Sequence, residues 1–270
     1  MSALAHIFET MEKSKNNNSR RDFIKTLGLS AAAFTIVPRH VLGKGFRAPS
    51  DTFYLGGIGV GGKGYSDLTE SAKSPAVKVV SLCDVDDRRA ANAVKTFADA
   101  KYYKDYRKML EQEKGLDGVT VSTPDHMHAI IALNAMERGL HVYVQKPLTH
   151  DIAEARQMTE AAHKYKVVTQ MGNQGASGDG VRQMQEWYQA GLIGEAEEVW
   201  CWTDRPVWPQ GIAWPSEKKA QVPKELDWDL WLGTAPKKDY VDNLVPFNWR
   251  GWWDYGTGAL GDMACHIIEP

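Results

Sequence analysis

The sequence predicts an α/β protein with a doubly wound parallel sheet, followed by a second α/β region. Three observations predict this class. Short apolar segments alternate with helix-like segments from residue 52 onward, a glycine-rich turn follows the first of them, and an aspartate ends the second. Repeated strand–helix units of this length are typical of a parallel sheet with helices on both faces.

The first unit carries the most informative turn. Residues 53–58 read as a short strand, Gly59-Val60-Gly61-Gly62-Lys63-Gly64 follows at once, and residues 65–72 are predicted to be helical. In such a turn Gly59 allows the tight bend, Gly61 lets backbone N–H groups approach a pyrophosphate, and Gly64 allows close helix–strand packing. The motif has low specificity when it stands alone.

A second feature raises that specificity. The strand predicted over residues 77–83 is followed directly by Asp84, 20 residues beyond Gly64. A carboxylate at this place accepts hydrogen bonds from the adenosine ribose hydroxyls of a dinucleotide. The turn and the acid together predict a nicotinamide dinucleotide site.

The residues after Asp84 bear on which dinucleotide binds. Asp86 and Asp87 add negative charge that repels a 2′-phosphate, so NAD is predicted in preference to NADP. Arg88 and Arg89 argue the other way, but their offset predicts that they lie on the next helix.

The alternation continues to residue 171. Strands are predicted at 102–103, 118–122, 141–144 and 167–171, and helices at 90–98, 106–113, 125–138 and 151–165. Asp151 and Glu154 have the spacing of a capping box at the start of the last helix. Apolar residues recur on one face of that helix.

Three later motifs give the sequence a family resemblance. They are Gln145-Lys146-Pro147-Leu148-Thr149-His150, Thr123-Pro124-Asp125-His126-Met127-His128 and Gly261-Asp262-Met263-Ala264-Cys265-His266. In this order they resemble the glucose–fructose oxidoreductase/inositol dehydrogenase/MocA family, and the resemblance runs from about residue 52 to the end of the chain. Family members join a Rossmann domain to an α/β domain with an open antiparallel sheet, and most oxidise or reduce sugars and polyols.

The resemblance implies roles for three residues. Lys146 matches the lysine that bonds the reacting hydroxyl, and Asp262 and His266 match the acid/base positions. The residue types suit the chemistry, because hydride leaves a carbinol carbon only if the hydroxyl proton is also removed. Histidine titrates near neutrality, and a nearby cation stabilises a developing alkoxide.

The cofactor-binding residues predicted from the turn, the acid and the motifs are Gly59, Gly61, Gly62, Gly64, Asp84, Ser122, Thr123, Pro124, His126, Gln145 and Lys146. Two positions depart from the family pattern. The family more often has Glu where this chain has Gln145, and Gly where it has Ala264. A neutral amide at position 145 still forms hydrogen bonds but lowers the local negative charge.

All ten tryptophans lie between Trp187 and Trp253. Aromatic faces beside hydrogen-bonding groups suit carbohydrate rings, although most of these side chains are expected to serve packing. Trp249 and Arg250 are predicted to lie nearest the substrate, and the irregular segment 206–246 is predicted to be a loop or lid.

The first fifty residues have a different character. Ser19-Arg20-Arg21-Asp22-Phe23-Ile24-Lys25 precedes a short apolar run over residues 26–37, an order that resembles a twin-arginine export signal. The resemblance implies a periplasmic or otherwise exported protein that crosses the membrane already folded. No clean cleavage site is evident.

The composition excludes several classes of protein. The formal net charge of −2 offers no basic footprint for nucleic acid. No stretch reaches about 18 apolar residues, so no membrane span is expected in the mature protein. The three cysteines form no CxxC pair and predict neither a disulfide framework nor a zinc site, and no metal ligands are predicted.

The predicted organisation is a signal and linker over residues 1–51, an NAD-binding domain over 52–171 and a partial substrate domain over 172–270. Residues 195–203 are predicted to form the first strand of the second sheet, and the chain is expected to be C-terminally incomplete. The family resemblance implies that a complete chain forms a homo-oligomer through that sheet.

The sequence supports three functional hypotheses. The main one is an NAD-dependent oxidoreductase that transfers hydride between the cofactor and a sugar, polyol or sugar derivative. The first alternative is a glycoside hydrolase or lyase that oxidises the sugar transiently with tightly held NAD. The second is a non-catalytic sugar-binding protein, for which Gln145 is the hint.

Overall fold

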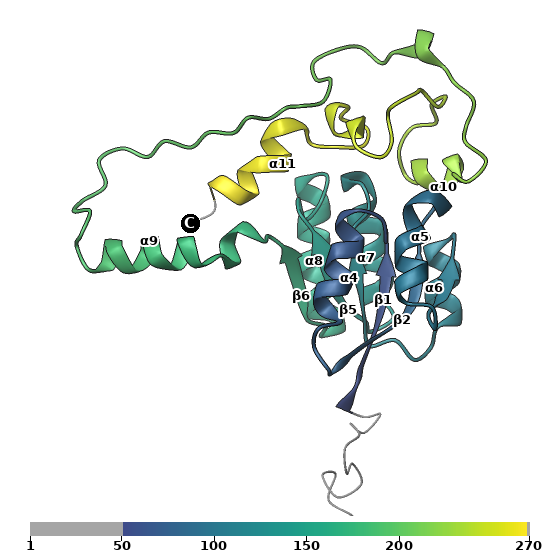
Figure 1. The fold of residues 1–270 in the computed structure, drawn as a ribbon, viewed down its shortest axis with the longest axis horizontal. Coiled ribbons are helices and arrows are strands. Elements are labelled where there is room, and N and C mark those ends of the chain that lie inside the picture. Colours follow the sequence, from purple (N-terminus) through teal and green to yellow (C-terminus); the bar gives the residue numbers. More distant parts are fainter. Residues whose placement is uncertain (1–50, 269–270) are drawn as a thin grey trace, which may run out of the picture. The chain divides into compact units, whose positions relative to one another are not determined.

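A computed structural model describes residues 51–268, and its centre is a six-stranded parallel sheet (Figure 1). The order across the sheet is β3-β2-β1-β4-β5-β6, which reverses direction between β1 and β4 as in doubly wound dinucleotide-binding folds. The strands are β1 (Phe53–Ile58), β2 (Val77–Cys83), β3 (Lys101–Tyr103), β4 (Gly118–Val121), β5 (His141–Gln145) and β6 (Thr169–Gly172).

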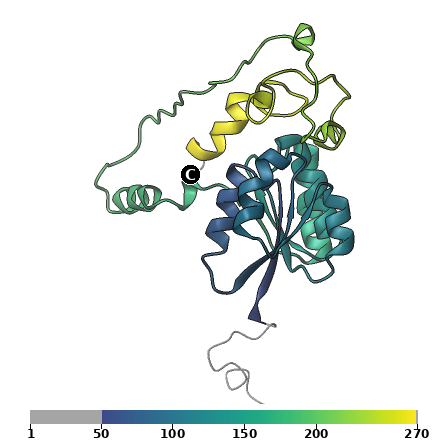
Figure 2. The ribbon, with the colours of Figure 1, turned by 45° about the vertical axis from the view of Figure 1, so that its right-hand side comes forward.

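Helices cover both faces of this sheet (Figure 2). On one face α4 (Lys63–Ser71) and α5 (Asp87–Thr96) supply Leu68 and Ala90 to an apolar cluster. On the other face α6 (Tyr106–Gln112), α7 (His128–Met136) and α8 (Ile152–Tyr165) supply Met109, Met136 and Met158 to a larger cluster. Successive strand side chains point to opposite faces, so β1, β2 and β3 contribute to both clusters, whereas β4 and β5 contribute to the larger one.

The predicted strands and helices between residues 52 and 171 are confirmed in order, with several boundaries shifted by one to three residues. The helix expected over 125–138 begins as a 3₁₀ turn, Asp125–Met127, in which the His126 N–H bonds to the Tyr255 carbonyl, 3.3 Å away. The last strand begins at Thr169, because the Val167 N–H still bonds to Ala162 of α8.

The predicted strand over residues 195–203 was wrong. After the short η3 (Gly175–Ser177) and α9 (Asp179–Gln189), the backbone of these residues forms no strand in the structure. Trp200 and Trp202 in this segment are 74% and 80% exposed. A strand requires a neighbouring strand for its backbone hydrogen bonds, and none of the strands described in residues 51–268 pairs with this segment.

The rest of the described chain contains short elements joined by irregular backbone. They are η4 (Ser216–Lys218), α10 (Trp228–Leu232), η5 (Asn248–Gly251) and α11 (Gly258–Ile267). Segment 206–246 is largely irregular, as predicted, but part of it packs into an apolar cluster that includes Trp231, Leu244 and Tyr255. Packing therefore accounts for much of the tryptophan content.

This cluster is bonded to the carboxyl ends of the strands. The Asp227 N–H donates to the Val85 carbonyl at 2.9 Å, and Lys104 Nζ donates to the Glu225 carbonyl at 2.6 Å. The Trp231 carbonyl lies 3.1 Å from Nε2 of His126. These bonds place the cluster over the edge of the sheet at which β2 and β4 end.

Within residues 51–268, none of the helices has the length and apolar character needed to cross a bilayer. The predicted export signal falls on residues outside this range. The predicted domain boundaries at 51/52 and 171/172 stay predictions.

The capping box predicted for α8 is confirmed. The Glu154 N–H donates to Oδ1 of Asp151 at 2.9 Å, and the Glu154 carboxylate accepts from the Asp151 N–H at 3.3 Å. Both bonds satisfy N–H groups that the first turn of a helix leaves unpaired.

Removing this cap measures what it contributes to stability. We expect Asp151→Ala to lower the free energy of unfolding by about 1 kcal/mol, whereas Asp151→Ser retains most of it because serine also caps helices. Denaturant unfolding of the two variants checks this, with Glu160→Ala on the exposed face of α8 as the control. Equal losses in the alanine and serine variants would contradict the role of the cap.

Candidate active site

A pocket lies where β1, β2, β4 and β5 end. Its volume is about 810 Å³, within the range of about 300–1,000 Å³ that is usual for cofactor and ligand sites. One wall comes from the strand ends, and the other comes from residues 226–234, 245–250 and Asp262. The pocket therefore occupies the place where open α/β sheets bind ligands, beside the reversal in strand order.

The glycine turn between β1 and α4 lines the pocket through Gly59, Gly61 and Gly62. Gly59 has a φ of +76°, and a Cβ atom at Gly64 would lie 1.8 Å from the Gly59 carbonyl oxygen. Larger residues therefore do not fit at these two positions. No side chain caps the N-terminus of α4, so this end of the helix is open to an anion, although the Gly64 N–H already bonds to the Gly61 carbonyl at 3.1 Å.

The turn after β4 supplies a further sign of a ligand site. Ser122, Thr123 and Pro124 all line the pocket, as predicted. Oγ1 of Thr123 is buried and has no hydrogen-bond partner among the described residues. Because buried hydroxyls normally have partners, a polar ligand in this pocket would satisfy it. These residues and the glycine turn fit a dinucleotide.

Asp84 lies at the end of β2, as the sequence predicts. Its Oδ2 accepts hydrogen bonds from the N–H groups of Val60 and Gly61 at 3.0 and 3.1 Å, and its Oδ1 accepts from the Asp86 N–H at 3.0 Å. Burial raises the pKa of Asp84 to about 6, although the three N–H donors favour its ionised form. The carboxylate lines the pocket beside the glycine turn.

The charged residues after Asp84 are arranged as pairs. Arg88 and Arg89 lie on α5, as predicted. Arg88 forms a 2.6 Å ion pair with Asp86. Burial acts to raise the pKa of Asp86, but the contacts with Arg88 outweigh it, so the pKa is lowered. Asp86 is therefore largely neutralised, whereas the Arg89 side chain lies against Gly61 and Gly62 in the pocket lining.

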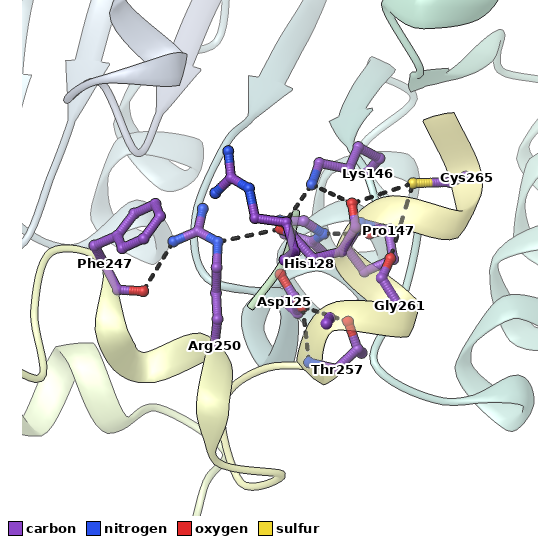
Figure 3. A network of polar contacts seen from close by, with 12 residues as sticks. Asp125, His128, Lys146, Pro147, Phe247, Arg250, Thr257, Gly261 and Cys265 are labelled. Atoms are coloured by element: carbon purple, nitrogen blue, oxygen red, sulfur yellow. Dashed lines mark hydrogen bonds and ion pairs between the residues drawn. The ribbon is translucent and has the colours of Figure 1, made fainter. Parts of the chain in front are cut away.

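Lys146, Asp262 and Arg250 meet in the pocket (Figure 3). Lys146 Nζ donates to Oδ1 and to the backbone carbonyl of Asp262, each at 2.7 Å, and Arg250 Nε donates to the same Oδ1 at 3.2 Å. The side chains of Lys146 and Asp262 are only 15% and 11% exposed. The sequence predicted these residues from separate motifs. The structure brings Lys146 and Asp262 into contact although they are 116 residues apart in the chain.

Aromatic rings hold Arg250 in place. Its guanidinium lies 4.3 Å from the ring centre of Trp249 and 4.6 Å from that of Phe247, and Nη1 donates to the Phe247 carbonyl at 3.1 Å (Figure 3). Cation–π contact and hydrogen bonding together restrict the rotamers of the side chain. Trp249 and Arg250, the predicted substrate-binding residues, both line the pocket.

Two supporting residues were missed from the sequence. The carboxylate of Asp125 accepts from Oγ1 and N–H of Thr257, at 2.9 and 3.2 Å, and so holds the start of α11 (Figure 3). Burial raises the pKa of Asp125, against the effect of nearby cations. The ring nitrogens of His128 lie 2.7 Å from the Pro147 carbonyl and 2.8 Å from the Thr123 carbonyl. Only knowledge of the contacts could have identified these roles.

Three predicted site residues lie outside the pocket lining: Gly64, which packs against the Gly59 carbonyl, His126 and His266. His126 is 3% exposed between Trp231 and Tyr255, and burial lowers its pKa to about 4. His266 lies beside Gly175, where a Cβ atom would be 3.6 Å from Nδ1 of the histidine. The roles of His126 at the cofactor and of His266 in acid/base chemistry stay predictions.

Across the part of the chain that the structure describes, no three His, Cys, Asp or Glu side chains are grouped as metal ligands.

Known proteins resemble the chain over both of its regions. Residues 54–173 match the model of an oxidoreductase family with an NAD-binding Rossmann fold, and residues 201–270 match the C-terminal α/β domain of the same family. A glycosyl hydrolase family 109 protein from Shewanella baltica (strain OS185) is 30% identical over 178 residues. An alpha-N-acetylgalactosaminidase from Shewanella oneidensis is 29% identical over 174 residues. Each alignment covers 55% of this chain and 38% of the relative's length.

Solved structures share the fold. The myo-inositol 2-dehydrogenase from Lactobacillus plantarum superimposes with a TM-score of 0.50 and 24% identity, over 53% of this chain and 43% of that chain. The match agrees with the strand order and with the glycine turn described above. The chain belongs to the glucose–fructose oxidoreductase/inositol dehydrogenase/MocA family of NAD-binding oxidoreductases.

Proposed function

We propose that this protein oxidises or reduces a CH–OH group of a sugar, a polyol or a sugar derivative with NAD. The observation that carries the proposal is the Lys146–Asp262 ion pair, which shares one pocket with the glycine turn and Asp84. A hydride-transfer enzyme needs a proton-handling group next to its dinucleotide, and this pair meets that need.

Bound NAD would supply the hydride chemistry, held by the glycine turn, Asp84 and Thr123. The protein's own contribution begins with Lys146. An ammonium group has three N–H donors, and two of them are committed to Asp262. The third remains for the oxygen of a substrate hydroxyl in the pocket, where it stabilises negative charge on that oxygen as the proton leaves.

Asp262 and Arg250 set the electrostatics of that step. Two cationic side chains share one carboxylate oxygen, so this end of the pocket carries one more positive than negative charge from the three residues. Exclusion of water strengthens the interaction, because both members of the Lys146–Asp262 pair are nearly buried. This arrangement favours an alkoxide-like substrate oxygen.

The aromatic lining supports a carbohydrate as the substrate class. Trp231, Phe247 and Trp249 line the same pocket as Lys146. Their flat faces suit the C–H face of a sugar ring, and Arg250 offers hydrogen bonds to hydroxyl groups.

The names of the Shewanella relatives favour a second candidate function. These relatives are described as glycosyl hydrolase family 109 proteins and as an alpha-N-acetylgalactosaminidase. The same pocket would then oxidise a glycoside transiently and return the hydride after cleavage, so NADH would not accumulate. Parallel assays of NADH formation and of glycoside cleavage on one sugar panel distinguish the two functions.

We expect Lys146→Met to lower kcat by at least about 100-fold, because one stabilising donor to the reacting oxygen is lost. The affinity for NAD should change by less than about threefold, since the glycine turn and Asp84 remain. Steady-state kinetics with titration of NAD measure both. Lys73→Met, at an exposed lysine just after α4, is the control. Unaltered turnover by Lys146→Met would instead favour a sugar-binding protein without catalysis.

The raised pKa of Asp84 predicts a pH-dependent affinity for NAD. The ionised carboxylate is the form that accepts two ribose hydroxyls, so binding should weaken as the pH falls through about 6. The Asp84→Asn variant should bind NAD more weakly at pH 8, and its affinity should no longer depend on pH in this range. Its preference for NAD over NADP should be smaller than that of the wild type. Calorimetric titration from pH 5 to pH 8, chosen to bracket that pKa, checks each point, and a wild-type profile that is flat over this range would count against the role.

We also propose that residues 1–51 direct export of the folded protein by the twin-arginine route. Fused to a reporter, this segment should carry it to the periplasm, and replacing Arg20 and Arg21 by lysine should abolish export. Export that persists in the double-lysine variant would show that the pair is not read as a signal.

A further inference from the structure

Asp67 is a buried carboxylate with no role in the chemistry described above. It lies in the second turn of α4, and its side chain is 5% exposed. Oδ2 accepts hydrogen bonds from Oγ of Ser122 at 2.9 Å and from Nε2 of Gln145 at 2.8 Å. Oδ1 forms a 2.8 Å ion pair with Lys63. A buried carboxylate requires this number of partners, because an unpaired charge is costly in the interior.

The three partners come from the three elements that build the cofactor pocket. Lys63 begins the helix that follows the glycine turn, Ser122 follows β4, and Gln145 ends β5. All three line the pocket, whereas Asp67 does not. Asp67 therefore acts on the pocket only through these neighbours.

The bond to Gln145 also fixes which way its amide faces. An ionised carboxylate only accepts hydrogen bonds, so the nitrogen of the amide must face Asp67. A Cβ atom at Gly172 would lie 2.8 Å from this nitrogen, so the glycine leaves the space that the amide occupies. The amide oxygen of Gln145 is consequently directed away from Asp67.

We propose that Asp67 is a positioning residue for the cofactor pocket, which fixes Gln145 and Ser122 and carries the negative charge of this corner in place of residue 145. The proposal rests on NAD binding and not on the sugar chemistry proposed above. Its consequence is that residues 67 and 145 are coupled: one of them carries a carboxylate and the other an amide. A carboxylate at both sites, as in Gln145→Glu, would place two buried carboxylates about 3 Å apart, where both cannot be ionised.

An exchange of the two groups tests this coupling in the whole protein. The variants are Asp67→Asn, Gln145→Glu and the double variant Asp67→Asn/Gln145→Glu, with dissociation constants for NAD and NADH measured by titration at pH 8. Gln145→Glu should weaken NAD binding by at least about tenfold, and the double variant should return to within about threefold of the wild type. Its asparagine amide can donate to the new glutamate, so the bond is kept with its polarity reversed.

The pH dependence separates electrostatic coupling from loss of shape. Relative to the wild type at each pH, the Gln145→Glu variant should regain affinity as the pH falls, because one proton shared by the two carboxylates removes their repulsion. Asp84 titrates in both proteins, so its effect cancels in the ratio of the variant's affinity to that of the wild type. Lys63 is the other charged group that contacts Asp67.

Glu70→Gln is the matched control, since it removes an exposed carboxylate from the same helix and should leave affinity unchanged. A double variant that binds no better than Gln145→Glu, whether or not the single variant folds, would overturn the proposal. So would a Gln145→Glu variant that binds NAD like the wild type at pH 8. A wild-type protein that binds no NAD would instead contradict the cofactor assignment itself.

Discussion

Burying a carboxylate at the edge of the sheet requires that it be paired, and three such carboxylates hold this structure together. Counted over the whole residue, Asp67, Asp125 and Asp262 are 7%, 5% and 7% exposed to solvent. Asp67 ties α4 to the ends of β4 and β5, Asp125 holds the start of α11, and Asp262 receives Lys146 from the end of β5. Removing one partner from such a pair leaves an uncompensated charge, so the elements they join cannot move apart freely.

The pairs also explain why the pocket is assembled from distant parts of the chain. Lys146 and Asp262 are 116 residues apart, and Asp125 and Thr257 are 132 apart. Asp125 holds the start of α11, the helix that carries Asp262. The aromatic cluster around Trp231 packs over the same edge, and its burial supplies the apolar stabilisation that a desolvated ion pair does not.

Local patterns made half of this arrangement predictable. The parallel doubly wound sheet, the glycine turn, Asp84 and the capping box at Asp151 follow from spacing within a few dozen residues. The partners of the buried carboxylates depend on long-range contacts, which periodicity does not encode, so Asp67 and Asp125 were missed. For the same reason β-forming residues at 195–203 predicted a strand, although a strand forms only beside a neighbour.

Fixed charges line both ends of the pocket, and their arrangement suits the proposed hydride chemistry. At the end with the glycine turn, Asp84 is buried against backbone N–H groups and Asp86 is neutralised by Arg88. At the other end Lys146 and Arg250 share the carboxylate of Asp262, and their charges also act on the buried carboxylate of Asp125. In the proposed reaction a carbinol that loses hydride must also lose its proton, and negative charge then builds on its oxygen. Fixed cations at that place stabilise the charge without having to reorganise, so the ion pair that joins α11 to the end of β5 is also well placed for the proposed reaction.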